Sequence, residues 1–131
     1  MSAYVTIEGN LTADPELRYL ADGTPVCRLR VAVNTRRKTS TGGYTDTEAE
    51  FYDVTVWGQA APNAAETLSK GAAVVAAGPT WTEAYADRNG DKRTKRVIRV
   101  QHLAASLRYA TATLTRNTTR QQEHQTDDID Q

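Results

Sequence analysis

The feature that most restricts the fold of this chain is a regular alternation of apolar and polar side chains. Successive side chains of a β-strand point to opposite faces, so alternation is typical of a strand with one buried and one wet face. In the clearest example, over residues 27–34, the apolar positions are Cys27, Leu29, Val31 and Val33, and the positions between them are Arg28, Arg30, Ala32 and Asn34. A chain with this pattern is expected to build a β-sheet.

Turn signals separate five such runs, and one helical run interrupts them. The pairs Gly9-Asn10, Asp22-Gly23 and Asn89-Gly90 mark turns, and the polar run KTSTGGYTDTE predicts a long exposed hairpin loop. The Ala-rich segment QAAPNAAETLSKG, with Gly71 as its stop, predicts a short helix that ends near Lys70. The predicted strands cover residues 3–8, 27–34, 50–58, 72–85 and 94–103.

This order of elements predicts an all-β domain with one short helix, arranged as a five-stranded OB-fold Greek-key barrel with extended hairpins. Such barrels bind oligonucleotides or oligosaccharides on one strand face. A chain of 131 residues is long enough for one domain with a modest core. From Thr111 onward the composition offers almost nothing to bury. We therefore expect an ordered domain over residues 1–110 and a disordered acidic tail over residues 111–131.

Charge and cysteine content narrow the possible functions. The net charge is zero, so bulk charge alone predicts no polyanionic partner. Cys27 is the single cysteine, which leaves no intrachain disulfide and no cysteine metal cluster, and its place in a strand predicts a small buried side chain. The N-terminus lacks the basic and apolar runs of a signal peptide or membrane span. A cytoplasmic protein without a membrane segment is expected.

No catalytic or metal-binding constellation is visible in the sequence. The histidines, His102 and His124, have no cysteine or histidine at ligand spacing, and no glycine-rich phosphate loop occurs. Glu48 and Glu50 flank a loop and are interpreted as a solvated entry to a strand. The sequence therefore predicts a protein that is not an enzyme and that uses no metal or cofactor.

Large aromatic side chains fall on the predicted wet faces of two strands. In the run EFYDVTVWG, alternation groups Tyr52 with Val54 and Val56 on a core-like face. The opposite face carries Phe51, Asp53, Thr55 and Trp57, and the next strand places Trp81 and Tyr85 on one face with Glu83. A β-bulge would exchange the two faces, so a core position for these rings remains an alternative.

Cations accompany the aromatic side chains. Arg28 and Arg30 lie on the wet face of their strand, and Arg36, Arg37 and Lys38 follow it. More cations come after the second hairpin tip, namely Lys92, Arg93, Lys95, Arg96 and Arg99. Bases of a single strand can stack on exposed rings while phosphates pair with Lys and Arg, whereas a duplex hides its base faces. The pattern favours a single-stranded nucleic acid as ligand, although the arginines alone could simply form a solvated face.

Several motifs resemble bacterial-type single-stranded DNA-binding proteins. The run IEGNLTADPELRYLADGTPV carries the most specific pattern, and SLRYATA resembles the actinobacterial branch. The segments EFYDVTVWG, LSKGAAVVAAG and RNGDKR follow in the family's order. The resemblance covers about residues 3–112. It implies a non-enzymatic, nucleoid-associated protein that coats single-stranded DNA with little sequence preference during replication, repair and recombination.

The resemblance also implies roles for individual residues. Bases would stack on Phe51, Trp57 and Tyr85, with Trp81 as a compensating ring, because Arg36 or Arg37 stands where the family has a tryptophan. Lys70 matches a family lysine, and Asp53 replaces a basic residue. The implied phosphate contacts come from Arg28, Arg30, Arg36, Arg37, Lys70 and Arg93.

The family forms homotetramers, some of them dimers of dimers, so the resemblance implies that Tyr4, Thr6 and Tyr52 face a partner chain. The terminal TDDIDQ resembles the family's acidic partner-docking tip without its Pro-Phe end, which implies weak recruitment of replication or repair proteins. Three alternatives remain open. The chain could bind single-stranded RNA, it could be an OB barrel that contacts proteins through its aromatic face, or it could be a small enzyme.

Overall fold

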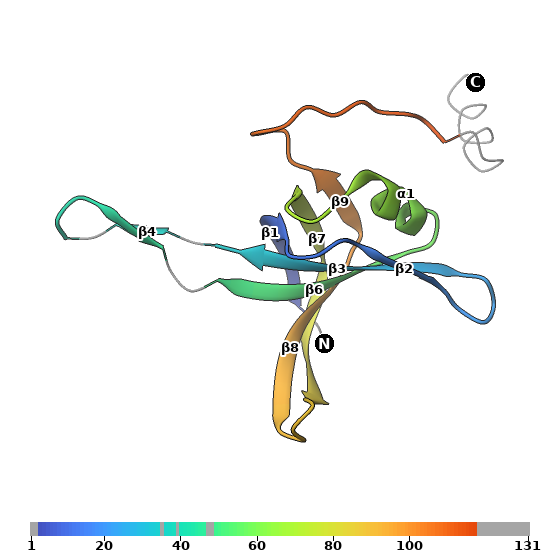
Figure 1. The fold of residues 1–131 in the computed structure, drawn as a ribbon, viewed down its shortest axis with the longest axis horizontal. Helices are drawn as coiled ribbons and strands as arrows, with labels where there is room; N and C mark the ends of the chain where they lie inside the picture. The colour runs from blue at the N-terminus through green and yellow to red at the C-terminus, as the bar shows by residue number, and fades with distance from the viewer. Residues whose placement is uncertain (1–2, 35, 39, 47–48, 118–131) are drawn as a thin grey trace.

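The computed structural model describes residues 3–34, 36–38, 40–46 and 49–117 of the chain (Figure 1). Side chains of residues 36–38 and 44–46 are not among the described atoms. The elements are β1 (Ala3–Leu11), β2 (Glu16–Tyr19), β3 (Pro25–Val33), β4 (Arg36–Lys38), β5 (Tyr44–Asp46), β6 (Glu50–Trp57), α1 (Ala60–Thr67), β7 (Ala73–Ala86), β8 (Lys92–Arg99) and β9 (His102–Ala105).

Five of these strands close into a barrel. β1 pairs with β3, β3 with β6, β6 with β8, β8 with β7, and β7 returns to β1. Only the β6–β8 pairing is parallel among these five. This closed order is the five-stranded OB-fold barrel that the sequence predicted, with one short helix.

The barrel interior is filled by the apolar positions of the alternating strands. Leu29 of β3, Val54 of β6 and Ile98 of β8 are almost completely buried, and Tyr52 and Val56 lie on the same inner face as Val54. Burial of this apolar surface is the main driving force for closing the barrel. The expected core face of residues 50–58 is therefore confirmed.

Helix α1 covers one end of the barrel and contributes Ala61 and Ala64 to the core. The sequence predicted that it ends near Lys70, but it ends at Thr67, because Leu68 already has an extended backbone and turns its side chain into the core. Gly71 has a φ of 91°, a conformation that favours glycine, and it follows the helix as predicted.

Cys27 is fully buried, as the alternation predicted. Burial raises the pKa of the Cys27 thiol, and the nearby Glu16 raises it further. Both effects disfavour the reactive thiolate.

The strand predictions were incomplete in three places. Strand β2 was not predicted; it pairs with the first half of β3, which begins at Pro25 rather than at residue 27. Two short paired strands were also not predicted: β5 lies inside the predicted loop, and β4 precedes it and ends at its first residue, Lys38. The return strand divides at Val100 and Gln101 into β8 and β9, because its register with β7 changes there: three residue steps on β7, from Thr80 to Ala77, are matched by four on the return strand, from Ile98 to His102.

The junction between β8 and β9 depends on Gly78. A Cβ atom at this residue would collide with the carbonyl oxygen of Arg99, which lies against the β7 backbone there. The Gln101 amide donates to the Ala77 carbonyl at 2.8 Å, and the Val100 amide donates to the Thr55 carbonyl at 2.9 Å. Glycine at position 78 therefore permits the close approach that holds β8 and β9 on β7.

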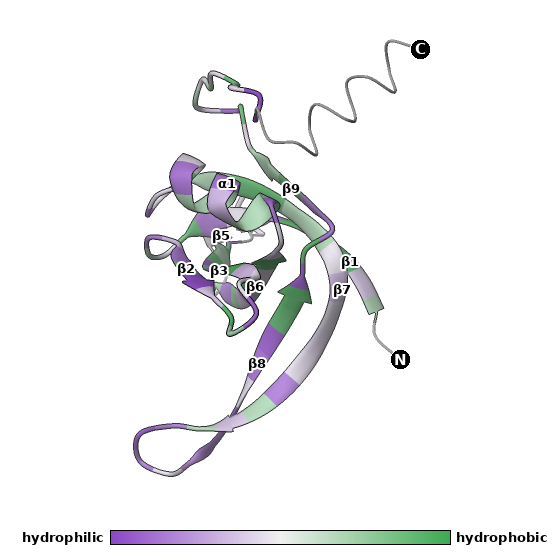
Figure 2. Cartoon of the chain, turned by 90° about the vertical axis from the view of Figure 1, so that its right-hand side faces the viewer, coloured by the Kyte–Doolittle hydropathy of each residue, from purple (hydrophilic) through white to green (hydrophobic). Residues whose placement is uncertain are grey.

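The second half of β7 and the first half of β8 extend beyond the barrel as a curved hairpin with a hydrophilic tip (Figure 2). Beyond β9, residues 106–117 have no regular secondary structure and run above α1 (Figure 1). Asn117 Nδ2 donates to Asn63 Oδ1 of the helix at 3.0 Å. Most of the predicted disordered tail, residues 118–131, lies outside the described residues. Within the described part of the chain, no helix has the length and apolar character needed to cross a membrane.

Candidate nucleic-acid interface

The four aromatic side chains that the sequence singled out are exposed on the outside of the sheet. Their exposed fractions are 45% for Phe51, 40% for Trp57, 38% for Trp81 and 45% for Tyr85. The predicted faces are therefore confirmed, and the alternative of a core position is wrong for all four. Large rings that remain this exposed are candidates for binding, because burying them would have stabilised the fold.

Strand register brings these rings onto one surface. Strand β8 lies between β6 and β7, with Val97 opposite Asp53 on one side and opposite Trp81 on the other. Directly opposed residues of neighbouring strands point to the same side of a sheet. The rings of β6 and the rings of β7 therefore flank the outer face of β8.

The surface contains two hollows. The first has a volume of about 290 Å³ and is lined by Trp57 and Trp81. The second has a volume of about 490 Å³ and is lined by Phe51 and Tyr85. Asp53 and Lys95 line both hollows, so they lie between the two pairs of rings.

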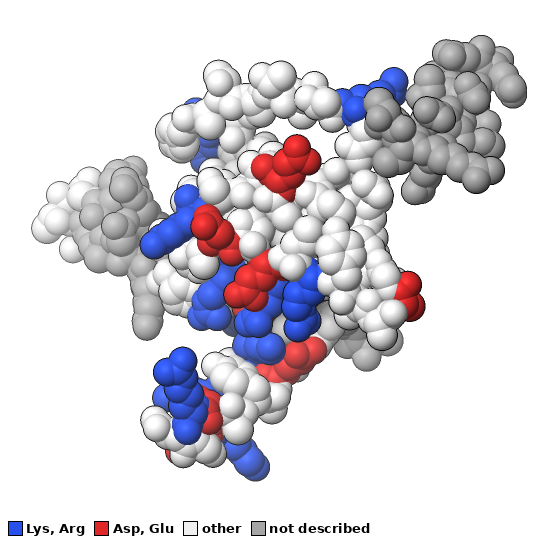
Figure 3. Space-filling view, turned by 45° about the vertical axis from the view of Figure 1, so that its right-hand side comes forward, with Lys and Arg blue, Asp and Glu red and all other residues white. Residues whose placement is uncertain are grey.

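Cations lie over three of the four rings. The guanidinium of Arg30 is 5.0 Å from the centroid of Phe51, and that of Arg99 is 4.9 Å from the centroid of Trp57. The ammonium of Lys95 is 5.8 Å from the centroid of Tyr85. Distances within about 6 Å are those of cation–π contacts. Figure 3 shows that Lys and Arg side chains gather on this side of the molecule, above the projecting hairpin, with acidic groups among them.

Asp53 departs from its predicted environment. Alternation placed it on the wet face, but it is only 4% exposed, because cations from two neighbouring strands cover it. Its Oδ2 is 3.3 Å from Arg28 Nη2 and 3.5 Å from Lys95 Nζ, and its Oδ1 is 3.6 Å from Arg30 Nη1. A buried carboxylate needs such partners to remain charged. The outer face therefore has a charged centre between its two hollows.

Not all predicted phosphate-binding residues belong to this surface. Arg28 and Arg30 line it, but Lys70 precedes β7 at the end opposite Trp81 and Tyr85, and its amide donates to Asp14 Oδ1 at 2.8 Å. More than ten strand residues at about 3.3 Å each separate Lys70 from Tyr85 along β7. The side chains of Arg36 and Arg37 lie outside the described atoms; only their backbone pairing in β4 is described.

Arg93 lies on the projecting hairpin, opposite Tyr85 in the β7–β8 register. Its Nε donates to Asp87 Oδ2 at 3.0 Å. This hydrogen bond lowers the pKa of the Asp87 carboxyl, and bonds from the amides of Asp91 and Asn89 lower it further. The same contacts hold the tip of the hairpin, because they tie both of its sides to one carboxylate.

Sequence reasoning did not select two cations that contact the rings, Lys95 and Arg99. The signal was present in the alternation of β8, which puts Arg93, Lys95, Val97 and Arg99 on one face. Residues 92–96 include cations on both faces, so the segment appeared uniformly basic. Glu83 was noted only as a companion of Trp81, yet its carboxylate accepts a hydrogen bond from Trp81 Nε1 at 2.9 Å and so fixes the indole ring.

Tyr52 does not lie where a partner chain would reach it. The resemblance implied a subunit contact, but the ring is 7% exposed within the chain's own core. Its hydroxyl accepts a hydrogen bond from Arg96 Nη1 at 3.1 Å, and Arg96 also pairs with Glu50 at 3.3 Å. Arg96 thus covers the phenol end of a core residue, on the opposite face of β8 from Lys95 and Arg99.

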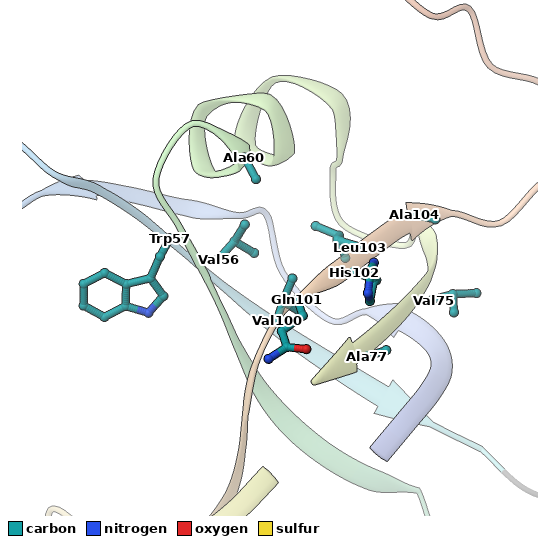
Figure 4. Close-up of a pocket in the computed structure, with 10 residues that line it drawn as sticks. All are labelled: Val56, Trp57, Ala60, Val75, Ala77, Val100, Gln101, His102, Leu103 and Ala104. Atoms are coloured by element: carbon teal, nitrogen blue, oxygen red, sulfur yellow. The ribbon is translucent and has the colours of Figure 1, made fainter. Parts of the chain in front are cut away.

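A third hollow lies between α1 and the β8–β9 junction and has a volume of about 570 Å³. Val56, Val100 and Leu103 line it, and Figure 4 shows Trp57 at its edge with the indole directed away. His102 also borders this hollow. Among the residues that the structure describes, no group of three His, Cys, Asp or Glu side chains could hold a metal ion.

The closed barrel and its outer face define a class of protein. An OB-fold barrel that exposes rings and cations on one strand face is the architecture of an oligonucleotide-binding module. More narrowly, the chain belongs to the single-strand binding protein family, whose model matches residues 3–106. This match confirms the family resemblance that the sequence motifs indicated.

Similar proteins come from the actinobacterial branch, as the sequence predicted. The chain is 43% identical over 109 residues to the single-stranded DNA-binding protein of Mycobacterium tuberculosis. The aligned region covers 82% of this chain and 66% of that protein. It is 42% identical over 119 residues to single-stranded DNA-binding protein 1 of Tropheryma whipplei. That aligned region covers 90% of this chain and 64% of that protein. The chain thus spans less than two thirds of the length of these curated relatives.

A solved structure has the same fold. The small single-stranded DNA-binding protein from Streptomyces coelicolor superposes with a TM-score of 0.74 at 29% identity, over 81% of this chain and 95% of that one.

Proposed function

We propose that this protein binds single-stranded DNA with little sequence preference and that it is not an enzyme. The observation that supports this most directly is the outer face itself, on which four exposed rings surround a cluster of cations. Every base has a π face, so stacking on a ring does not depend on sequence. Family membership and the names of the relatives point to the same ligand.

In the proposed mechanism, unpaired bases stack on Phe51, Trp57, Trp81 and Tyr85, each contributing about 1–3 kcal/mol. The sugar–phosphate backbone runs along the cations between the rings and releases counterions, so affinity falls as salt rises. On this face the phosphate contacts come from Arg28, Arg30, Lys95 and Arg99, and Arg93 adds one on the hairpin. Arg36, Arg37 and Lys70 would contact phosphates of the same DNA strand where it continues past these residues. Duplex DNA would bind poorly, because its base faces are already stacked.

The biological role follows from this binding. We propose that the protein keeps strands unpaired and protected during replication, repair and recombination in the cytoplasm, at the nucleoid. Residues 1–110 would be the binding domain. Residues 111–131 would form an acidic tail that recruits replication or repair proteins weakly.

We also propose a homotetramer, built as a dimer of dimers. Among the described residues, the 3–8 segment of β1 pairs only with β7, so its other edge presents free backbone groups. Tyr4, which is 55% exposed, lies on this strand with Thr6. Free strand edges are templates for pairing with another chain. Sedimentation equilibrium would give the mass, and a monomer at micromolar concentration would contradict the proposal.

The binding proposal is tested by titrating the protein with an unstructured oligo-dT while following tryptophan fluorescence at several salt concentrations. Trp57 and Trp81 are the two tryptophans of the chain, so the signal reports on the first hollow. We expect strong quenching that reaches a plateau at a fixed ratio of nucleotide to protein and weakens with salt. An unchanged signal at low salt would mean that DNA does not stack in this hollow.

An RNA oligomer of matched sequence provides the control for the sugar, since stacking and phosphate contacts hardly distinguish ribose from deoxyribose. Binding of RNA tighter than DNA would overturn the choice of ligand and leave the stacking mechanism in place.

A further inference from the structure

Two rings of the outer face are covered by cations that also contact Asp53. Arg30 lies over Phe51 and Lys95 lies over Tyr85, while each also pairs with the Asp53 carboxylate, at 3.6 Å and 3.5 Å. A cation above a ring centroid occupies one face of that ring. A base that stacks on the same face has to displace it.

Asp53 is suited to hold these cations in place. It is fixed on a central strand of the barrel, is 4% exposed and lies between the two hollows. Arg28 is its third partner, at 3.3 Å. Arg28, Arg30 and Lys95 carry like charges and would repel one another if they met without an anion. Their approach to one point therefore depends on the Asp53 carboxylate.

The same contacts are easily exchanged. The side chains of Arg28, Arg30 and Lys95 are 49%, 50% and 34% exposed, so each reaches water on its outer side. Asp53 Oδ1 is buried and receives no hydrogen bond from the residues that the structure describes, so charge, rather than a fixed bonding geometry, holds Arg30 there. A phosphate that approaches from solvent can therefore compete for these cations.

We propose that Asp53 is an internal counter-anion that holds Arg30 and Lys95 over Phe51 and Tyr85 until DNA phosphates draw them away. Release of the two cations then opens both rings of the second hollow to bases. This inference rests on the proposed function, because it assigns a resting state to the same face. Asp53 would thus lower the affinity for single-stranded DNA while keeping the unoccupied face ordered.

The opposite role would be that Asp53 positions the cations for DNA and so raises affinity. The two roles predict changes of opposite sign when the carboxylate is removed. Loss of a bare negative charge from the face also raises affinity, so a charge control is needed. Glu50 is suitable, because it lines the second hollow but pairs with Arg96 rather than with Arg30 or Lys95.

The experiment compares Asp53→Asn and Glu50→Gln with the wild type by fluorescence anisotropy of a labelled oligo-dT across a salt series. Removing one charge about 10 Å from a phosphate in water changes affinity about twofold, which is the expectation for Glu50→Gln. For Asp53→Asn we expect a gain of about tenfold at low salt, because freed cations and opened rings add to the charge effect.

A double-mutant cycle with Tyr85→Leu separates ring opening from charge. Without the ring, the gain from Asp53→Asn should shrink toward that of Glu50→Gln. A gain that persists in full without the ring, or that matches Glu50→Gln from the start, would overturn the inference. A loss of affinity would also overturn it and would assign Asp53 the positioning role.

Two further controls keep the outcome clear. If Asp53→Asn does not fold, Asp53→Thr makes the same test with a neutral β-branched residue that suits a strand. If the wild type fails to bind oligo-dT, the proposed function itself fails. Failure of the inference alone requires a wild type that binds and Asp53 variants that bind no better than Glu50→Gln.

Discussion

The inner face of strand β6 consists of Tyr52, Val54 and Val56, all buried, whereas its outer face presents Phe51 and Trp57 to solvent. One strand thus carries two sets of large side chains that a two-residue period keeps apart. The inner set removes apolar surface from water in the chain itself. The outer set leaves that surface available to a ligand. The contrast suggests that stability and binding can be changed separately in this domain.

The largest effect should come from the inner face. Leu29 is 1% exposed, so Leu29→Ala should leave a cavity and lower the free energy of unfolding by about 2–5 kcal/mol. Urea denaturation followed by circular dichroism measures this. Where the variant is still folded, its DNA affinity should stay close to that of the wild type. A cost below about 1 kcal/mol would show that the core relaxes around the site.

The next largest effect concerns binding. Trp57→Leu should weaken binding of a labelled oligo-dT by about 1–3 kcal/mol, and its free energy of unfolding should change by only about 0.5 kcal/mol. Tyr19→Leu is the matched control, because Tyr19 is 63% exposed and lines neither hollow. Equal losses in both variants would mean that the hollows have no special role.

A smaller effect is expected when one cation is removed. The salt dependence of DNA affinity should change when the cation lies on the outer face and should stay the same when it lies elsewhere. Arg99→Gln should reduce the slope of log affinity against log salt by about one, as expected for one lost phosphate contact. Arg108, which pairs with Glu8 at 3.5 Å and lines neither hollow, provides the control. Its Arg108→Gln variant should keep the wild-type slope. The comparison fails if the two variants change the slope by the same amount.

The smallest effect lies at the hairpin tip, far from the core. The pKa of Asp87 is lowered in the folded protein, so its charge stabilises the tip at pH values above its ordinary pKa of 3.8. This contribution is lost as pH falls through the lowered pKa of the folded state. The amide NMR shifts of Asn89 and Asp91 should therefore titrate with a midpoint below 3.8. A midpoint at or above that value would contradict the role of Arg93.

Local patterns in the sequence correctly predicted the side chains whose inner or outer position depends only on alternation along their own strand. Alternation in β3 and β6 separated Leu29 and Val54 from Phe51 and Trp57, and the structure confirms both sets. The order of strands and helix was enough to predict the OB barrel. The family motifs predicted the family, and the match of the family model to residues 3–106 confirms it.

Features that depend on contacts between distant segments could not be read in this way. Asp53 appeared exposed, because its three cationic partners come from β3 and β8, which are separated from it by more than twenty residues in sequence. Strand β9 was merged with β8, because only a one-residue change in the register with β7, near Gly78, separates them. The sequence did not distinguish Lys95 and Arg99 from the neighbouring cations, because only the pairing of β8 with β7 shows that they lie on the outer face.

The close approach at Gly78 has a consequence for how this sequence can vary. No side chain fits between the β7 backbone and the Arg99 carbonyl, so any missense change at this codon would disturb the barrel whether or not DNA is present. The codon of Tyr85 has no such restriction, because its side chain lies on the outer face, is 45% exposed and is covered on one side by Lys95. In a library selected for folding alone, position 78 should remain glycine while position 85 drifts toward any residue. Selection for growth that requires the protein's activity should restore the aromatic residue at position 85 and leave position 78 unchanged.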